Sequence, residues 1–168
     1  EVSRLFFQSG GASGTIAKTI SAYDIAFSDS IYGKTGRYVS HSRLQKMLDY
    51  EYQQVTELLT EKRAPETRFF AFANTVTTIN YQKTNVGHGW LGMRFQLTPG
   101  GEPNEVIIHI QLLEQDALLQ QQTIGIMGVN LVFACYHHYD RPNAFLRSLL
   151  DNLASDRVEV TMIEMDGQ

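Results

Sequence analysis

The segment WLGMRFQLTPGGEPNEVIIHIQLL, residues 90–113, decides the fold that the sequence predicts. Both of its halves alternate apolar side chains with other residues, at Leu91, Met93, Phe95 and Leu97 and then at Val106, Ile108, Ile110 and Leu112. A period of two is typical of a half-buried β-strand. The prolines and glycines of TPGGEPN indicate a turn between the halves. We therefore expect two antiparallel strands joined as a hairpin.

The segments around this hairpin supply the rest of the fold. Residues 68–81 are rich in aromatic and β-branched side chains, and residues 158–165 alternate, so each favours a strand. Apolar stripes at helical spacing predict helices over 13–32 and from Ser40 or Ser42 to about 64. Two more helices are expected over 116–137 and from Pro142 onward. The order α-α-β-β-β-α-α-β indicates an α+β fold, with a mainly antiparallel sheet of about four strands and the helices packed on one face.

The helix expected over 116–137 begins polar and ends apolar on all sides, which predicts that its second half is central and buried. Gly125 and Gly128 would let a neighbouring element approach closely. Asn130 needs a hydrogen-bond partner if it is buried. Cys135 reads as a small buried thiol in preference to a reactive nucleophile.

Length and composition set further limits. The chain has 168 residues, which as a prior is a single domain spanning 1–168, and we expect it to be the N-terminal part of a longer protein. A net charge of −4 gives no basic footprint for nucleic acid or an anionic membrane. One cysteine excludes an internal disulfide, and the apolar run 124–136 is too short to cross a bilayer. These features predict a cytoplasmic protein.

The glycine-rich turn before the first expected helix is the first candidate site. It matches neither the phosphate-loop pattern nor the full dinucleotide-binding pattern. Free backbone amides at a helix start, with hydroxyls and a lysine nearby, would nevertheless suit an anion. The alternative is that the turn only caps the helix. The expected ligand-binding residues are Gly10, Gly11, Ser13, Gly14, Thr15 and Lys18.

His88 lies between two glycines beside the only tryptophan, where it could act as a general base or contact a ligand. The alternative is a hairpin end in which the glycines serve the turn. Arg94 and His109 occupy the polar alternation of adjacent strands and could share a pocket or simply face solvent. His88 and Arg94 are the expected catalytic residues. No metal site is expected, because His137, His138 and Asp140 lack a ligand spacing that would support one.

The sequence resembles a widespread bacterial family of uncharacterised activity. The segments that carry the resemblance are GGASGTIAKTISAYDIAFSDSIYG, RYVSHSRLQKMLDYEY, RFFAFANTV, HGWLGMRFQ and GVNLVFACYHH. Its members are inconsistently called TonB-dependent receptor or nicotinate-nucleotide adenylyltransferase. A receptor barrel needs many more strands than the four expected here. The paired-histidine pattern of an adenylyltransferase is absent, because Gly89-Trp90 follows His88. The resemblance implies that the chain is similar to an N-terminal portion of such proteins, and it implies no catalytic residue.

Two hypotheses follow. In the first, the chain is a domain of a soluble enzyme that binds a small anionic metabolite or nucleotide at the glycine-rich turn, with the reaction and any cofactor unknown. In the second, it is a non-catalytic assembly domain that forms a homo-oligomer or docks a partner through an apolar helix face. A concave pocket joining the turn, His88 and Arg94 would favour the first hypothesis, and an exposed apolar patch would favour the second.

Overall fold

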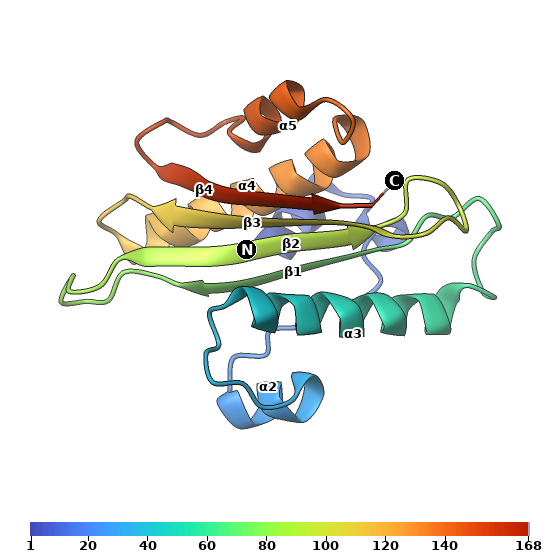
Figure 1. The fold of residues 1–168 in the computed structure, drawn as a ribbon, viewed down its shortest axis with the longest axis horizontal. Coiled ribbons are helices and arrows are strands. Elements are labelled where there is room, and N and C mark those ends of the chain that lie inside the picture. The colour runs from blue at the N-terminus through green and yellow to red at the C-terminus, as the bar shows by residue number, and fades with distance from the viewer. Residues whose placement is uncertain (168) are drawn as a thin grey trace.

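The computed structural model describes residues 1–167, which form a four-stranded antiparallel sheet with helices against both of its faces (Figure 1). The helices are α1 (Val2–Ser9), the short 3-10 helix η1 (Ala12–Gly14), α2 (Ile25–Tyr32), α3 (His41–Leu59), α4 (Ala117–His137) and α5 (Pro142–Leu149). The strands are β1 (Phe70–Thr77), β2 (Gly87–Phe95), β3 (Asn104–Leu112) and β4 (Val158–Asp166).

The strands lie in the sheet in chain order, β1-β2-β3-β4. The predicted hairpin is confirmed: β2 and β3 pair antiparallel, with Phe95 opposite Asn104 next to the turn and Gly87 opposite Leu112 at the other end. The register between β3 and β4 shifts between His109 and Ile110. The predicted α+β class and the antiparallel four-stranded sheet are thereby confirmed.

One face of the sheet, the α4 face, carries the larger core. α4 packs against β2 and β3 there, and α1 and α5 pack against α4. Asp116 caps α4 by accepting a hydrogen bond from the Leu119 amide at 2.9 Å. The close approach expected at Gly128 is confirmed, because a Cβ there would lie 2.9 Å from a Val2 methyl and 3.0 Å from the Phe72 ring. The buried residues of this core include Leu91, Met93, Phe95, Val106, Ile108, Ile110, Met127, Leu131, Phe145 and Leu149.

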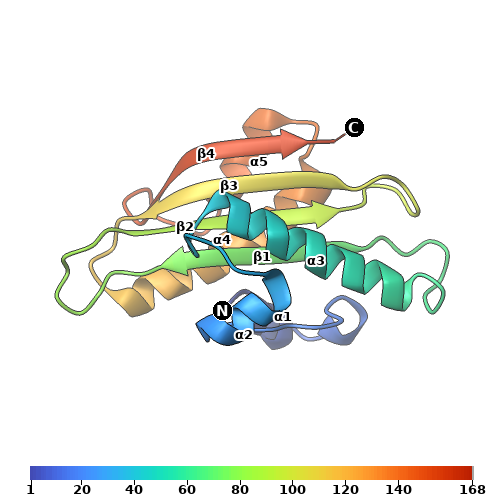
Figure 2. The same ribbon diagram turned by 60° about the horizontal axis from the view of Figure 1, so that its bottom comes forward.

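The opposite face, the α3 face, is also covered, which differs from the expectation that the helices share one face. α3 packs across β1 and β2, as Figure 2 shows. Leu44 and Leu48 of α3 form a second buried cluster with Ala73 and Ile107. Gly92 makes this packing possible, because a Cβ there would lie 2.8 Å from Leu48 and 2.9 Å from Leu44. The alternation in the sequence hid this contact, because Ala73, Gly92 and Ile107 on this face stand among polar residues and do not form an apolar stripe.

The helix expected over 13–32 is wrong. The chain forms α1 and η1 first, then an extended stretch, and the next helix begins only at Ile25. Asp24 caps that helix, since its carboxylate accepts a hydrogen bond from the Phe27 amide at 2.8 Å. The serines and threonines of residues 15–21 compete for backbone hydrogen bonds and disfavour a helix interior. Residues 10–24, here called the N-terminal arm, lead from α1 on the α4 side of the sheet to α2 on the α3 side (Figure 2).

The other three helices form where they were expected, although α3 ends at Leu59, before the expected end at about 64. Ser40 caps α3, and Pro142 is the first residue of α5. Asn130 donates to the carbonyl oxygens of Leu149 at 2.9 Å and Asp151 at 2.8 Å, and Cys135 is completely buried. Burial raises the pKa of the Cys135 thiol well above its usual range, so this thiol stays protonated. Within residues 1–167 only α4 is long and apolar enough to cross a membrane, and 61% of its apolar window is buried inside the protein, as in a core helix.

Candidate functional site

The part of the α3 face that α3 leaves uncovered carries three histidines. His88 on β2 and His109 on β3 project from this face, and His41 begins α3 beside them. We call these residues, together with Trp90, Thr161 and Glu164, the histidine cluster. The β2–β3 register brings Trp90, His109 and His88 together at the centre of the cluster. Trp90 lies directly opposite His109, and His88 is diagonal to His109.

A chain of hydrogen bonds runs through the cluster from β2 to β4. Nδ1 of His88 lies 3.1 Å from Nε2 of His109, and Nδ1 of His109 lies 2.6 Å from the Thr161 hydroxyl oxygen. Thr161 also donates its single hydroxyl proton to the carbonyl oxygen of His109 at 3.2 Å. The shift in β3–β4 register next to His109 accompanies these contacts.

One arrangement of protons satisfies all three contacts at once. Because the Thr161 proton goes to the carbonyl, the Thr161 oxygen accepts from His109, so His109 is protonated at Nδ1. Nε2 of His109 then accepts, and Nδ1 of His88 donates to it. Nε2 of neutral His88 is left as a lone pair, and it has no hydrogen-bond partner among residues 1–167. The arrangement therefore presents His88 as an oriented base.

Trp90 supports the cluster from the side of α3. Its ring centroid lies 4.6 Å from that of His109 and 5.3 Å from that of His41. Trp90 also packs against the buried cluster beneath α3, so it joins the histidines to the core. His41 is held in turn by Glu164 of β4, with 3.1 Å between its Nε2 and a carboxylate oxygen. These contacts hold the side chains of Trp90, His41 and His109 in place on the open part of this face.

The electrostatic surroundings favour a neutral His109. Burial, and then the neighbouring His88, lower the pKa of His109 below its ordinary value. The carboxylates on this face of β3 and β4 include Glu105, Glu159 and Glu164. Burial raises the pKa of Glu105, and Arg94 opposes that rise. Glu159 is two strands from His88 in the sheet, because it lies opposite Gln111, the partner of His88.

The glycine-rich turn lies elsewhere. It follows α1, which packs on α4 at the opposite face of the sheet from His88. Gly10 and Gly11 have positive φ of 76° and 70°, and the Gly10 amide donates back to Phe7 at 3.3 Å, so these glycines end α1. Beyond Ser13 and Gly14 the Thr15 amide donates to Ala12 at 2.9 Å. The turn thus ends one helix and does not begin a long one.

The two cations expected at a site already have partners. Lys18 lies 2.5 Å from a carboxylate oxygen of Glu51 on α3 and ties the N-terminal arm to that helix. Arg94 forms an ion pair with Asp49 and lies 3.6 Å from Glu105. The structure therefore does not bring the glycine-rich turn, His88 and Arg94 together into one pocket.

The sequence left open whether His109 shares a pocket with Arg94 or faces solvent. In the structure Arg94 lies opposite Glu105, and the partners of His109 are His88 and Thr161. Thr161 was not expected at any site. Its only signal in the sequence is its place in a strand that could lie next to β3.

The other histidines lie outside the cluster and form no metal site with their neighbours in the part of the chain that the structure describes. No group of three or more His, Cys, Asp or Glu side chains in residues 1–167 is arranged to hold a metal ion. His137 stacks on Phe133, with 4.3 Å between ring centroids, and His138 accepts a hydrogen bond from Arg141 at 2.9 Å.

Comparison with known proteins gives no relative: no protein-family model, no curated protein and no solved structure matches this chain.

Proposed function

We propose that this chain is a domain of an enzyme in which His88 exchanges a proton with a substrate bound on the open part of the α3 face. The observation that supports the proposal is the hydrogen-bond chain from His88 through His109 to Thr161. Each link orients the next ring, as in a catalytic triad where one group fixes the tautomer of the base. His88 is the acid or base, and His109 and Thr161 are positioning residues.

The surrounding charges select the kind of substrate. Glu164 belongs to the cluster, Glu159 lies on the same strand opposite Gln111, and Arg94 pairs with the carboxylates of Asp49 and Glu105. A negatively charged substrate would be repelled by Glu159 and Glu164, and Arg94 is already engaged. The site therefore favours a neutral or cationic substrate. An anionic ligand at the glycine-rich turn stays a prediction, and its one expected cation, Lys18, is engaged by Glu51.

The reactivity of His88 can be measured with a neutral ester such as p-nitrophenyl acetate, which reports an oriented imidazole base. We expect His88→Gln to lower the hydrolysis rate by about 10²-fold, the low end of the usual contribution of general-base catalysis. His137→Gln is the matched control, because His137 is exposed and lies outside the cluster. Equal rates for wild type and His88→Gln would refute the proposal.

The roles of the positioning residues need a separate readout. Thr161→Val removes the acceptor that holds the His109 proton, so we expect a lower rate and a displaced pH profile. Thr161→Ser restores the hydroxyl and should restore both. Nitrogen chemical shifts of the imidazoles should show His109 protonated at Nδ1 in the wild type and a mixture of tautomers in Thr161→Val.

The location proposed for the protein is the cytoplasm. The single cysteine is a buried thiol and not part of a disulfide, which suits a reducing compartment. Fractionation of cells that express a tagged chain tests this proposal directly.

A second candidate function is assembly with another copy of the chain. Four large apolar side chains close together in the sequence are exposed: Ile20 at 42%, Tyr23 at 96%, Ile25 at 60% and Phe27 at 50%. Such clustering on a surface is typical of an interface. Two of the charges near them have partners within the chain, since Lys18 pairs with Glu51 and Asp29 with Arg43.

This second function predicts a dimer whose stability depends on those side chains. Light scattering after size-exclusion chromatography should give twice the 19.0 kDa mass of the chain. Tyr23→Ser combined with Phe27→Ser should give the monomer. Leu118→Ser, which changes an exposed apolar residue on α4, is the control and should leave the dimer intact. A monomeric wild type at high concentration would rule this function out.

A further inference from the structure

A row of polar side chains crosses the sheet at His88, with one residue from each strand. The strand pairing places Thr77 of β1 and Gln111 of β3 opposite His88, on its two sides, and Glu159 of β4 opposite Gln111. Residues that lie opposite one another on neighbouring strands project from the same face of a sheet. All four therefore belong to the α3 face, and none of them is buried. We call these residues the polar row.

Gln111 is the neighbour of His88 on β3. Residues directly opposite one another have Cβ atoms about 5 Å apart, so the Gln111 amide and the His88 ring are within reach of one small molecule. The side-chain amide of Gln111 makes no hydrogen bond within residues 1–167, and it has two protons to donate. Side-chain amides that donate to a carbonyl oxygen stabilise the negative charge which develops there during acyl transfer. Gln111 is thus placed as a donor beside the free Nε2 of His88.

Glu159 makes the row asymmetric in charge. It is exposed, and its carboxylate has no ion pair or hydrogen bond in the part of the chain that the structure describes. It lies one strand beyond Gln111, which is about 4.8 Å at the usual strand spacing. Thr77, on the other side of His88, carries no charge. A bound molecule therefore meets a negative charge at the β4 end of the row and a neutral hydroxyl at the β1 end.

We propose that the polar row hydrolyses an ester whose acyl group carries a positive charge. The cation lies at Glu159, the carbonyl oxygen accepts from Gln111, and the leaving group points toward Thr77. The charge is then about one strand spacing from the carbonyl carbon, which a short acyl chain spans. This inference names the substrate class for the proposed function, and it rests on that function.

The reaction consumes one water molecule. Nε2 of His88 takes a proton from the water as the water oxygen bonds to the carbonyl carbon, and Gln111 donates to the oxygen that becomes negative. The bond between the carbonyl carbon and the leaving oxygen then breaks. The proton passes from His88 to the leaving oxygen, or to solvent where the leaving group is a stable phenolate. The products are a carboxylic acid and an alcohol.

The test compares p-nitrophenyl esters that differ in charge. The cationic ester is 4-trimethylammoniobutanoate, the neutral ester of the same shape is 5,5-dimethylhexanoate, and the anionic ester is glutarate. We expect kcat/KM to be about threefold higher for the cationic than for the neutral ester, as for one exposed ion pair, and lowest for the anionic ester. The preference should disappear in about 1 M salt, which screens exposed charges.

Two variants separate the roles of the row. Gln111→Ala should lower kcat for all three esters by about 10²-fold and leave KM nearly unchanged, because the donor acts on charge that develops in the transition state. Glu159→Gln should raise KM for the cationic ester only and abolish its advantage over the neutral one. Melting temperatures equal to that of the wild type would show that neither variant acts by unfolding the chain.

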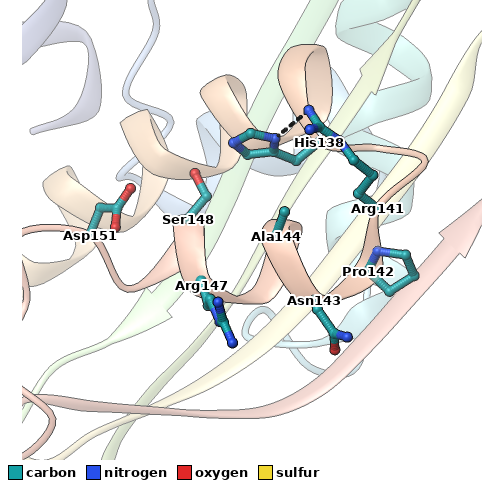
Figure 3. A pocket seen from close by; sticks show the side chains of 8 residues that line it. All are labelled: His138, Arg141, Pro142, Asn143, Ala144, Arg147, Ser148 and Asp151. Carbon is teal, nitrogen blue, oxygen red and sulfur yellow. Dashed lines mark hydrogen bonds between the residues drawn. The ribbon is translucent and has the colours of Figure 1, made fainter.

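Matched controls come from α5, which packs with α4 on the other face of the sheet. Figure 3 shows Asn143 and Asp151 beside a depression along this helix, and both residues are exposed. Asn143→Ala removes an amide and Asp151→Asn removes a carboxylate, as the two test variants do. We expect both controls to hydrolyse the three esters as the wild type does.

The outcomes distinguish this inference from the proposed function. Wild-type rates in His88→Gln for every ester would refute the proposed function and this inference with it. A slow His88→Gln together with a wild-type kcat in Gln111→Ala, or with an unchanged preference in Glu159→Gln, would overturn the assignment of the polar row alone.

Discussion

Arg43 of α3 donates a hydrogen bond to the Ser28 hydroxyl of α2 at 2.6 Å, although only 1% of Arg43 is exposed. The same guanidinium donates to the Gly33 carbonyl, and the rings of Tyr32 and Tyr38 lie 5.4 Å and 5.2 Å from it. A buried cation is tolerated only with such a full set of partners. The contact is thus the main polar attachment of α2 to the rest of the fold.

Replacing Arg43 should detach this region. Arg43→Ala leaves Ser28 and the Gly33 carbonyl without their donor, and we expect a loss of about 3 kcal/mol in the free energy of unfolding. Arg43→Lys should recover only part of it, because an ammonium cannot reach all of these acceptors at once. Urea unfolding gives the energies, and limited proteolysis should show new cleavage in the N-terminal arm. Wild-type resistance to proteolysis in Arg43→Ala would contradict the assignment.

Gly92 allows α3 to lie against the sheet, so adding a side chain there should separate the two. The new methyl of Gly92→Ala would lie 2.8 Å from Leu48 and 2.9 Å from Leu44, both of which are fully buried. We expect a loss of roughly 1–3 kcal/mol, the usual cost of overpacking a core. Gly36→Ala is the control, because nothing lies within 4 Å of the added Cβ and its φ is not positive. Equal stabilities of the two variants in urea would disprove the packing argument.

Asn130 joins α4 to the end of α5 through the carbonyls of Leu149 and Asp151. Asn130→Ala leaves both oxygens without a donor in a buried region, and we expect it to lower the free energy of unfolding by about 2 kcal/mol. Hydrogen exchange should accelerate in α5 more than in β2 or β3. Uniform acceleration throughout the chain would indicate a general loss of packing instead.

The sheet could be predicted because its signal is local. The alternation around Met93 and Ile108 specifies two strands, and the Pro-Gly turn between them specifies their antiparallel pairing. The coverage of both faces could not be predicted, because Gly92 gives no apolar signal, and its importance depends on Leu44 and Leu48, more than forty positions earlier.

The N-terminal helix shows how local signals compete. Ser13 and Asp24 both suit a helix N-cap, and the stripe from Ile16 to Ile31 fits a single helix equally well. The structure uses Asp24, because the segment before it forms the arm that Lys18 ties to α3. Tertiary contacts decide between two possible N-caps. The sequence of a short segment does not reveal those contacts.

The candidate site was predictable in part for a similar reason. His88 stood out because it lies between glycines beside Trp90. Its contact with His109 depends on the strand register, and the contact of His109 with Thr161 depends on a shift in the β3–β4 register. Such a shift has no distinct signature in the sequence.

His109 should make stability depend on pH. Its pKa in the folded chain lies below the ordinary value of 6.5, first because of burial and then because of His88. Folding therefore favours neutral His109, and its contribution to stability is present above pH 6.5 and is lost as the pH falls through the lowered pKa of the folded state. Urea unfolding of wild type and His109→Gln at about pH 7.5 and about pH 5 tests this, since an ordinary histidine titrates between them. The wild type should lose more stability on acidification than the variant, because Gln does not titrate, whereas His41, His88 and Glu164 are present in both proteins. If both chains lose the same amount, protonation of His109 does not oppose folding, and the hydrogen-bond chain from His88 to Thr161 does not depend on a neutral ring.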